Sequence, residues 1–220
     1  FGFCVGDINY DGPLKPPLHP RRLLDGIIEG VKDGGNKSGV PTTFGQTLFN
    51  SGYMGKSLVF VTALGIMPNT VNDKPSHKKT TSPGELIVMS GGRVGKDGIH
   101  GVTASSESYS ENTPAGHVQI GDPYTQKKMH DFLLICRDEG LIPFITDNGG
   151  GGLSSSVGES AMISNGCEVW LDKVPLKYEG LDMWEIWISE SQERMTISVK
   201  PEDIDRFMEL SALHEVESTV

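Results

Sequence analysis

The sequence predicts an α+β fold in which a mixed sheet is packed with helices in layers. The main observation is that strand-like and helix-like segments alternate from residue 84 to the end of the 220-residue chain. A chain of this length buries roughly 70% of its unfolded surface, so it needs no disulfide bonds. The 28 glycines occur in clusters, and their share is about twice the usual value of roughly 7%. Such clusters indicate tight turns or backbone that closely approaches a ligand.

The first 83 residues predict one helix, one strand and a linker. The apolar residues of the helix share one face: Leu23, Leu24, Ile27, Ile28 and Val31. We expect this helix to end at Gly34 and Gly35. Residues 57–67 are rich in β-branched side chains and predict a buried strand. Residues 69–83 are polar and predict a linker.

The remaining residues predict the layered part of the fold. Strands are expected at 84–89, 141–145, 167–171 and 195–199, and residues 102–116 read as a loop. Asp122 and Pro123 are typical of a helix start, and this helix should run to about Glu139. Its buried stripe comprises Met129, Phe132, Leu133 and Cys136. Two further helices are expected at 153–164 and from Pro201, the latter with Ile204, Phe207, Met208 and Leu213 on one face.

Charge and cysteine usage exclude several classes of partner. A formal net charge of -10 argues against nucleic acid and against an anionic membrane surface, because both require clustered Lys and Arg. The chain has no apolar run that could span a bilayer, and its first residues do not read as a signal peptide. Cys4, Cys136 and Cys167 are odd in number and widely spaced, as in reduced cytoplasmic proteins. We therefore expect a cytoplasmic protein.

The glycine-rich stretch 91–101 has two interpretations. It departs from the P-loop pattern, because Ser90 and Asp97 stand where Gly and Ser or Thr are required, and it lacks G-x-G-x-x-G. It could be a simple turn after a strand. It could also bind a phosphate or nucleotide through a loop containing Gly95, Lys96, Gly98 and His100.

A sharper signal is Asp147 at the end of a predicted strand, followed by four glycines and a helix. Backbone N–H groups at a helix N-terminus attract phosphate, and a carboxylate suits Mg²⁺. As a dinucleotide fingerprint the pattern is imperfect, because Ser154 replaces Gly or Ala, although Asp172 follows at about the ribose-binding distance. A tight turn without a ligand remains an alternative.

Two polar segments are not fully explained by local structure. Helix capping accounts for Asp122 but leaves Gln119 without a role. Residues 189–194 form a polar run between apolar segments, which reads either as a solvated turn or as part of a site.

Taken in order, these motifs resemble the phosphoribosylformylglycinamidine synthases, within the aminoimidazole ribonucleotide synthetase-like superfamily. The resemblance covers nearly the whole chain and is carried by residues 30–36, 39–42, 91–101, 118–123, 147–154, 171–176 and 189–195. It implies the tail of an N-type, ATP-binding-like domain at 1–78. It also implies a domain at 79–220 that is similar to the C-terminal domain of aminoimidazole ribonucleotide synthetase.

The resemblance also implies a reaction and its residues. ATP would phosphorylate the amide oxygen of formylglycinamide ribonucleotide, and ammonia from a glutaminase partner would displace phosphate; a small adaptor subunit would complete the complex. Asp147 resembles the family's Mg²⁺ ligand, and the substrate contacts would be Gln119, Glu190, Ser191 and Gln192. The family's catalytic histidine segment has no match in these 220 residues. We therefore expect no catalytic residue in the chain and no turnover by it alone.

Two other function classes compete with this interpretation. One is a doubly wound domain that binds a nucleotide or NAD. The other is a non-catalytic module that holds a larger assembly together.

Overall fold

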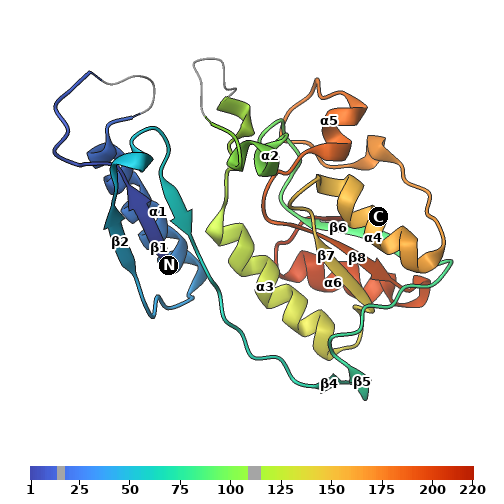
Figure 1. Cartoon of the computed structure of the whole chain (residues 1–220). Coiled ribbons are helices and arrows are strands. Elements are labelled where there is room, and N and C mark those ends of the chain that lie inside the picture. Colours follow the sequence, from blue (N-terminus) through green and yellow to red (C-terminus); the bar gives the residue numbers. More distant parts are fainter. Residues whose placement is uncertain (14–17, 109–114) are drawn as a thin grey trace. The chain divides into compact units, whose positions relative to one another are not determined.

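The computed structural model describes residues 1–13, 18–108 and 115–220, and the chain divides into two compact units (Figure 1). Unit 1 comprises residues 1–66 and 106–114, and unit 2 comprises residues 67–105 and 115–220.

Unit 1 combines one long helix with a small mixed sheet. Its strands are ordered β2–β1–β3, with β1 parallel to β2 and antiparallel to β3. The elements are β1 (Gly2–Val5), α1 (Pro20–Ser38), β2 (Gln46–Phe49), the 3₁₀ turn η1 (Ser51–Tyr53) and β3 (Leu58–Phe60). The central strand β1 buries Phe3, Cys4 and Val5, whereas β2 and β3 are exposed.

Two boundaries predicted for unit 1 were wrong. Helix α1 continues through Gly34 and Gly35 to Ser38, where Gly39 adopts a left-handed conformation (φ 73°) and donates its N–H to the Gly35 carbonyl. An ion pair between Asp33 and Lys37, 2.9 Å, supports this last turn. The predicted buried strand 57–67 forms only at Leu58–Phe60, and these three residues are exposed rather than buried. Residues 61–66 pair with no strand in the described part of the chain and are exposed, so nothing holds them in a ladder.

Unit 2 is built on a four-stranded sheet of order β7–β8–β6–β9, in which every neighbouring pair is antiparallel. The strands are β6 (Leu86–Gly91), β7 (Phe144–Asp147), β8 (Arg194–Val199) and β9 (Ser218–Thr219). Val88 lies opposite Ile197, and Met89 lies opposite Thr196. The α+β prediction is confirmed, but the doubly wound alternative is wrong, because that fold requires parallel strands.

Helices cover both faces of this sheet. Helices α3 (Pro123–Asp138) and α6 (Ile204–Leu213) pack on the face of Val88 and Ile197, and the rings of Phe132 and Phe207 meet edge to face at 5.1 Å. Helix α4 (Gly152–Ser164) packs on the opposite face, against Met89. The buried stripe predicted for α3 is confirmed at Met129, Phe132 and Cys136. In α6 the prediction for Leu213 was wrong, because this side chain is 74% exposed.

Short elements fill the remainder of unit 2. They are β4 (Thr70–Val71), β5 (Lys74–Pro75), α2 (Gly101–Ser105), η2 (Ala115–His117), η3 (Leu171–Lys173), α5 (Met183–Ile188) and η4 (Pro201–Asp203). The predicted linker 69–83 thus contains the β4–β5 hairpin, and the predicted loop 102–116 contains α2 and η2, although its residues 109–114 lie outside the described residues.

The strand predicted at 167–171 was wrong. Residues 167–170 are exposed and form no strand, the backbone of Trp170 is extended, and η3 follows directly. A strand needs a neighbouring strand to accept its hydrogen bonds. The nearest pairing in this region is a single bridge between Val94 and Leu176.

No helix in the described ranges is both long enough and apolar enough to cross a membrane.

Candidate functional site

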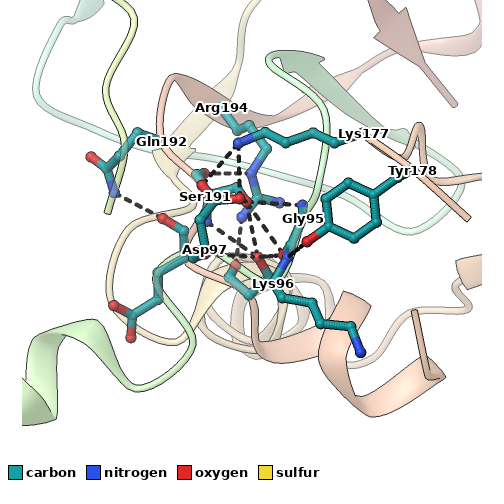
Figure 2. Close-up of polar contacts among 10 residues, drawn as sticks. Gly95, Lys96, Asp97, Lys177, Tyr178, Ser191, Gln192 and Arg194 are labelled. Carbon is teal, nitrogen blue, oxygen red and sulfur yellow. Dashed lines mark hydrogen bonds and ion pairs between the residues drawn. The ribbon is translucent and has the colours of Figure 1, made fainter. Parts of the chain in front are cut away.

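The centre of the candidate site is the segment 189–194, which connects α5 to β8. Ser189, Glu190, Ser191 and Arg194 are all buried. Figure 2 shows the polar contacts around this segment, with Arg194 and Lys177 on one side and the 95–97 loop on the other. The polar run in the sequence is therefore an internal turn rather than a solvated one.

Arg194 folds this segment back on itself. Its guanidinium donates Nε–H to the Ser191 carbonyl, 2.7 Å, and Nη2–H to the Ser189 carbonyl, 2.5 Å. Burial lowers the pKa of Arg194 to about 10, against the opposing effect of the Asp97 carboxylate. Arg194 is 2% exposed. The hydrogen bonds of this buried cation therefore hold the backbone of the turn in place.

The hydroxyl of Ser191 points into the protein. It donates to Asp97 Oδ1, 2.9 Å, and accepts the Gly95 N–H, 3.0 Å. Asp97 in turn binds Lys177, with 2.8 Å between Oδ2 and Nζ (Figure 2). The Ser189 hydroxyl donates to the Gly95 carbonyl, 2.6 Å. These contacts connect the 95–97 loop to the turn. They engage the Ser191 hydroxyl, which the sequence predicted to contact the substrate.

Three backbone N–H groups of the loop predicted to bind an anion are used within the protein. Besides Gly95, the Lys96 N–H donates to the Tyr178 hydroxyl, 2.8 Å, and the Gly98 N–H donates to the Gly116 carbonyl, 2.9 Å. The Lys96 ammonium pairs with Glu185, 3.0 Å, and a hydrogen bond with this carboxylate raises the pKa of Lys96. These contacts favour the interpretation as a turn, and the nucleotide-binding role stays a prediction.

The side chain of His100 is exposed, like that of Lys96. Its φ of 59° is left-handed, which a non-glycine residue adopts only at some cost. Its carbonyl accepts the Ala104 N–H at the start of α2. The ring lies 6.4 Å from that of His117, centroid to centroid.

The Glu190 carboxylate brings three distant segments together. Its Oε2 accepts the Gln119 side-chain N–H, 2.7 Å, and the Val102 N–H, 3.0 Å. Its Oε1 accepts the N–H of Gly151, 3.1 Å, at the start of α4. Gln119, Glu190 and the glycine turn, which the sequence singled out separately, therefore meet in one place.

Glycines let the backbone of the turn pack this closely. A Cβ at Gly152 would overlap the carbonyl oxygen of Ser189, and its φ of 58° is left-handed. A Cβ at Gly91, with φ 113°, would overlap the carbonyl oxygen of Glu193. Part of the glycine excess is thus explained by backbone that approaches other backbone.

Asp147 ends β7, and its side chain is exposed. One carboxylate oxygen accepts the Gly149 N–H, 2.9 Å. Within the described ranges no three His, Cys, Asp or Glu side chains lie close enough to hold a metal ion. Mg²⁺ commonly uses only one or two carboxylates and completes its shell with water and phosphate. The single exposed carboxylate of Asp147 is compatible with such a site, and its role as a Mg²⁺ ligand stays a prediction.

The remaining predicted residue, Gln192, is half-buried and donates its side-chain N–H to the Glu190 carbonyl, 2.8 Å. Reasoning from the sequence missed Asp97, Lys177 and Arg194. Asp97 and Arg194 lie within the stretches 91–101 and 189–194 that the sequence singled out, but nothing local predicts their inward contacts, because charged residues are normally exposed. It also missed Asn148, which is buried and accepts the Thr196 hydroxyl, 2.7 Å.

Two family models match the chain. Residues 7–67 match the AIR synthase related protein, N-terminal domain, and residues 82–220 match the AIR synthase related protein, C-terminal domain. The predicted domain boundary at 78/79 lies between these two matches, whereas the compact units divide at 66/67.

Among curated proteins, the chain is similar to the phosphoribosylformylglycinamidine synthase subunit PurL of Thermotoga maritima, with 40% identity over 90% of this chain. It spans 32% of that relative's length. A solved structure described as T. maritima PurL complexed with FGAR matches with a TM-score of 0.76 and 31% identity. The match covers 100% of this chain and 34% of the PurL chain.

Two further solved structures come from the same organism. T. maritima PurL complexed with ATP has a TM-score of 0.68 and 33% identity, covering 90% of this chain and 31% of its own. The structure of PurLQS has a TM-score of 0.67 and 30% identity, covering 100% of this chain and 32% of its own.

Proposed function

We propose that the chain is part of a phosphoribosylformylglycinamidine synthase. It belongs to the family of AIR synthase related proteins, whose N-terminal and C-terminal domain models match residues 7–67 and 82–220. This ATP-dependent carbon–nitrogen ligase of purine biosynthesis converts formylglycinamide ribonucleotide, ammonia and ATP to formylglycinamidine ribonucleotide, ADP and phosphate. The 40% identity to a PurL subunit and the fold shared with PurL bound to FGAR or ATP support the proposal.

The observation that carries the proposal is the convergence of Gln119, Glu190 and Gly151. A sugar phosphate with an amide side arm offers both acceptors and donors, so it suits side-chain amides such as those of Gln119 and Gln192, each of which carries a donor and an acceptor. In this proposal Gln119 and Gln192 contact the ribonucleotide. Ser191 and Arg194 hold the turn in place, through the hydrogen bonds of Ser191 to Asp97 and of Arg194 to the Ser191 carbonyl.

Asp147 supplies one ligand for Mg²⁺ in this proposal. When bound, Mg²⁺ neutralises the charge that develops on the transferred phosphoryl group. Asp147 is oriented by the Gly149 N–H, 2.9 Å away, which leaves its second oxygen for the metal. The chain's own contribution to the chemistry is thus to bind and orient, and its 220 residues supply no catalytic histidine segment.

The partners of the complete enzyme follow from the same proposal. A glutaminase subunit would deliver ammonia, and a small adaptor subunit would join the amidotransferase complex in the cytoplasm. The likeness to PurLQS supports this arrangement. Since the chain spans about a third of its relatives, it should bind ribonucleotide weakly and should not turn over alone.

Calorimetric titration of the purified chain with formylglycinamide ribonucleotide tests the proposal. Gln119→Ala should weaken binding about tenfold, the cost of one hydrogen bond. Gln126→Ala, on the exposed surface of α3, is the matched control and should bind like the wild type. Absence of ribonucleotide binding, or equal losses in the two variants, would contradict the proposal. Co-elution with the glutaminase subunit without ribonucleotide binding would instead support the non-catalytic interaction module.

A further inference from the structure

The contact between Gln119 and Glu190 has a fixed polarity. The Gln119 side-chain nitrogen lies 2.7 Å from Glu190 Oε2. An ionised carboxylate can only accept hydrogen bonds, so the NH₂ group of Gln119 must face it. The opposite orientation would place two acceptors in contact. The orientation of this amide is therefore set by its partner, whereas many glutamine side chains can be turned either way.

The surroundings of Glu190 keep its carboxylate an acceptor. The three groups that contact its oxygens are the Gln119 amide and the Val102 and Gly151 N–H groups, and all three donate. Two of them, the backbone N–H groups of Val102 and Gly151, can only donate, so Oε2 and Oε1 of the carboxylate each accept one backbone N–H. The side chain is 4% exposed, and turning it towards a ligand would break three hydrogen bonds.

The carboxylate of Glu190 thus acts within the protein, and Gln119 presents the opposite end of its amide. Among the described residues no hydrogen bond to Gln119 Oε1 is found, and the side chain is only partly buried. Oε1 is therefore the atom of this amide that is left for a ligand, and it is an acceptor.

From this geometry we propose that Glu190 is a positioning residue that fixes the Gln119 amide, and that Gln119 recognises a hydrogen-bond donor of the ligand. Resting on the proposed function, this makes the group beside Gln119 an amide N–H or a ribose hydroxyl of the ribonucleotide. It excludes the phosphate, whose oxygens would meet the Oε1 acceptor.

Side-chain amide NMR of the full chain tests the orientation without any ligand. The Gln119 signal is identified by its loss in Gln119→Leu. Its NH₂ protons should exchange more slowly with solvent than those of exposed Gln126, and one should be shifted downfield. Equal exchange for Gln119 and Gln126 in the wild type would overturn the proposal, and this comparison requires no variant to fold.

Glu190→Gln sharpens the same measurement. It should remove the downfield shift of Gln119, while Gln192, which donates to a backbone carbonyl, keeps its signal and serves as the internal control. A Gln119 shift that survives in Glu190→Gln would overturn the positioning role. If Glu190→Gln fails to fold, Glu190→Asp replaces it, because it keeps the charge but shortens the side chain. Glu190→Asp should weaken the downfield shift of Gln119. An unchanged shift in Glu190→Asp would overturn the positioning role of Glu190.

Two titrations test the nature of the ligand group. Inorganic phosphate should leave the Gln119 signal in place, and a saturable shift would overturn the assignment of a donor. Among ribonucleotide analogues that each lack one donor (2′-deoxy, 3′-deoxy or N-methylated amides), one should bind the wild type about tenfold more weakly than the parent does. That loss should vanish in Gln119→Leu. Equal binding of all analogues would overturn the assignment of a ligand donor beside Gln119. If the parent ribonucleotide does not bind at all, the proposed function is contradicted. The orientation of the Gln119 amide is then decided by the NMR result.

Discussion

The two faces of the unit 2 sheet are built from different chemistry. The face towards α3 and α6 is apolar, with Val88 and Ile197 packed against Phe132 and Phe207. The face towards α4 carries the apolar Met89 together with hydroxyl groups. There Thr196 donates to Asn148 Oδ1, 2.7 Å, and its hydroxyl lies 2.9 Å from that of Ser156.

The difference follows from where the site lies. The α4 face is continuous with the segment 189–194 through β8 and with Asp147 through β7. Hydrogen bonds fix the angle of a contact in a way that apolar packing does not. We infer that the α3/α6 face mainly stabilises unit 2, whereas the α4 face gives up some apolar burial to hold the ends of β7 and β8 in place.

The largest expected effect is on the apolar face. Phe132→Ala should lower the free energy of unfolding by about 3–5 kcal/mol, because it leaves a cavity in the core. Urea denaturation measures this loss. Leu213→Ala, at an exposed position of α6, should stay within about 0.5 kcal/mol of the wild type. Similar losses for Phe132→Ala and Leu213→Ala would break the comparison.

At the start of α4, Gly152→Ala should cost about 3 kcal/mol, since a Cβ meets the Ser189 carbonyl and the backbone is left-handed. Gly158→Ala in the same helix is the matched control. A Cβ there meets nothing within 4 Å, and this variant should gain about 0.5–1 kcal/mol from helix propensity. Denaturation of the two variants checks the opposite signs, and a shared sign would contradict the assigned role of Gly152.

Beneath α4, Thr196→Val tests the value of the hydroxyl network directly. It should cost about 1–2 kcal/mol, because Asn148 and Ser156 lose a buried partner. Thr103→Val on the exposed side of α2 is the control and should be nearly neutral. A Thr196→Val variant as stable as the wild type, or more stable, would contradict a net stabilising role for these hydroxyl contacts.

The smallest effect concerns Glu193, beside the turn. Burial raises the pKa of this carboxyl, the nearby Asp122 carboxylate raises it further, and the Asp122 N–H partly offsets both. Its ionisation therefore opposes folding: the stability of the wild type relative to Glu193→Gln is greatest below the ordinary glutamate pKa and falls as pH rises through the raised value. Melting temperatures of both proteins from pH 3.5 to 7 measure this, and a relative gain for the wild type at higher pH would contradict it.

Local signals predicted much of the fold. Helix α3 is the clearest example, because Asp122 caps it by accepting the Tyr124 N–H, Pro123 opens it, and its apolar stripe faces the core. Where the decisive interaction is distant, the prediction was wrong: residues 167–171 have strand-like composition but find no neighbouring strand in the described structure.

The site was predicted as a set of separate motifs rather than as an arrangement. The sequence marks Gln119, Glu190 and the glycine turn, but the contacts that join them span 71 and 39 residues. The burial of Arg194 has no local signal either, because it depends on the Ser189 and Ser191 carbonyls around it. Spacing along a chain reports on helices and strands, and not on which loops meet.

The wide sequence separation of the partners of segment 189–194 has a kinetic consequence. Gly95, Val102, Gln119 and Gly151 must all reach their final places before the Glu190–Ser191 turn is complete. Contacts between residues so far apart form late, since long loops must close first. A molecule that binds this turn would therefore recognise only chains that have finished folding, and by mass action it would protect the whole of unit 2 against unfolding and proteolysis.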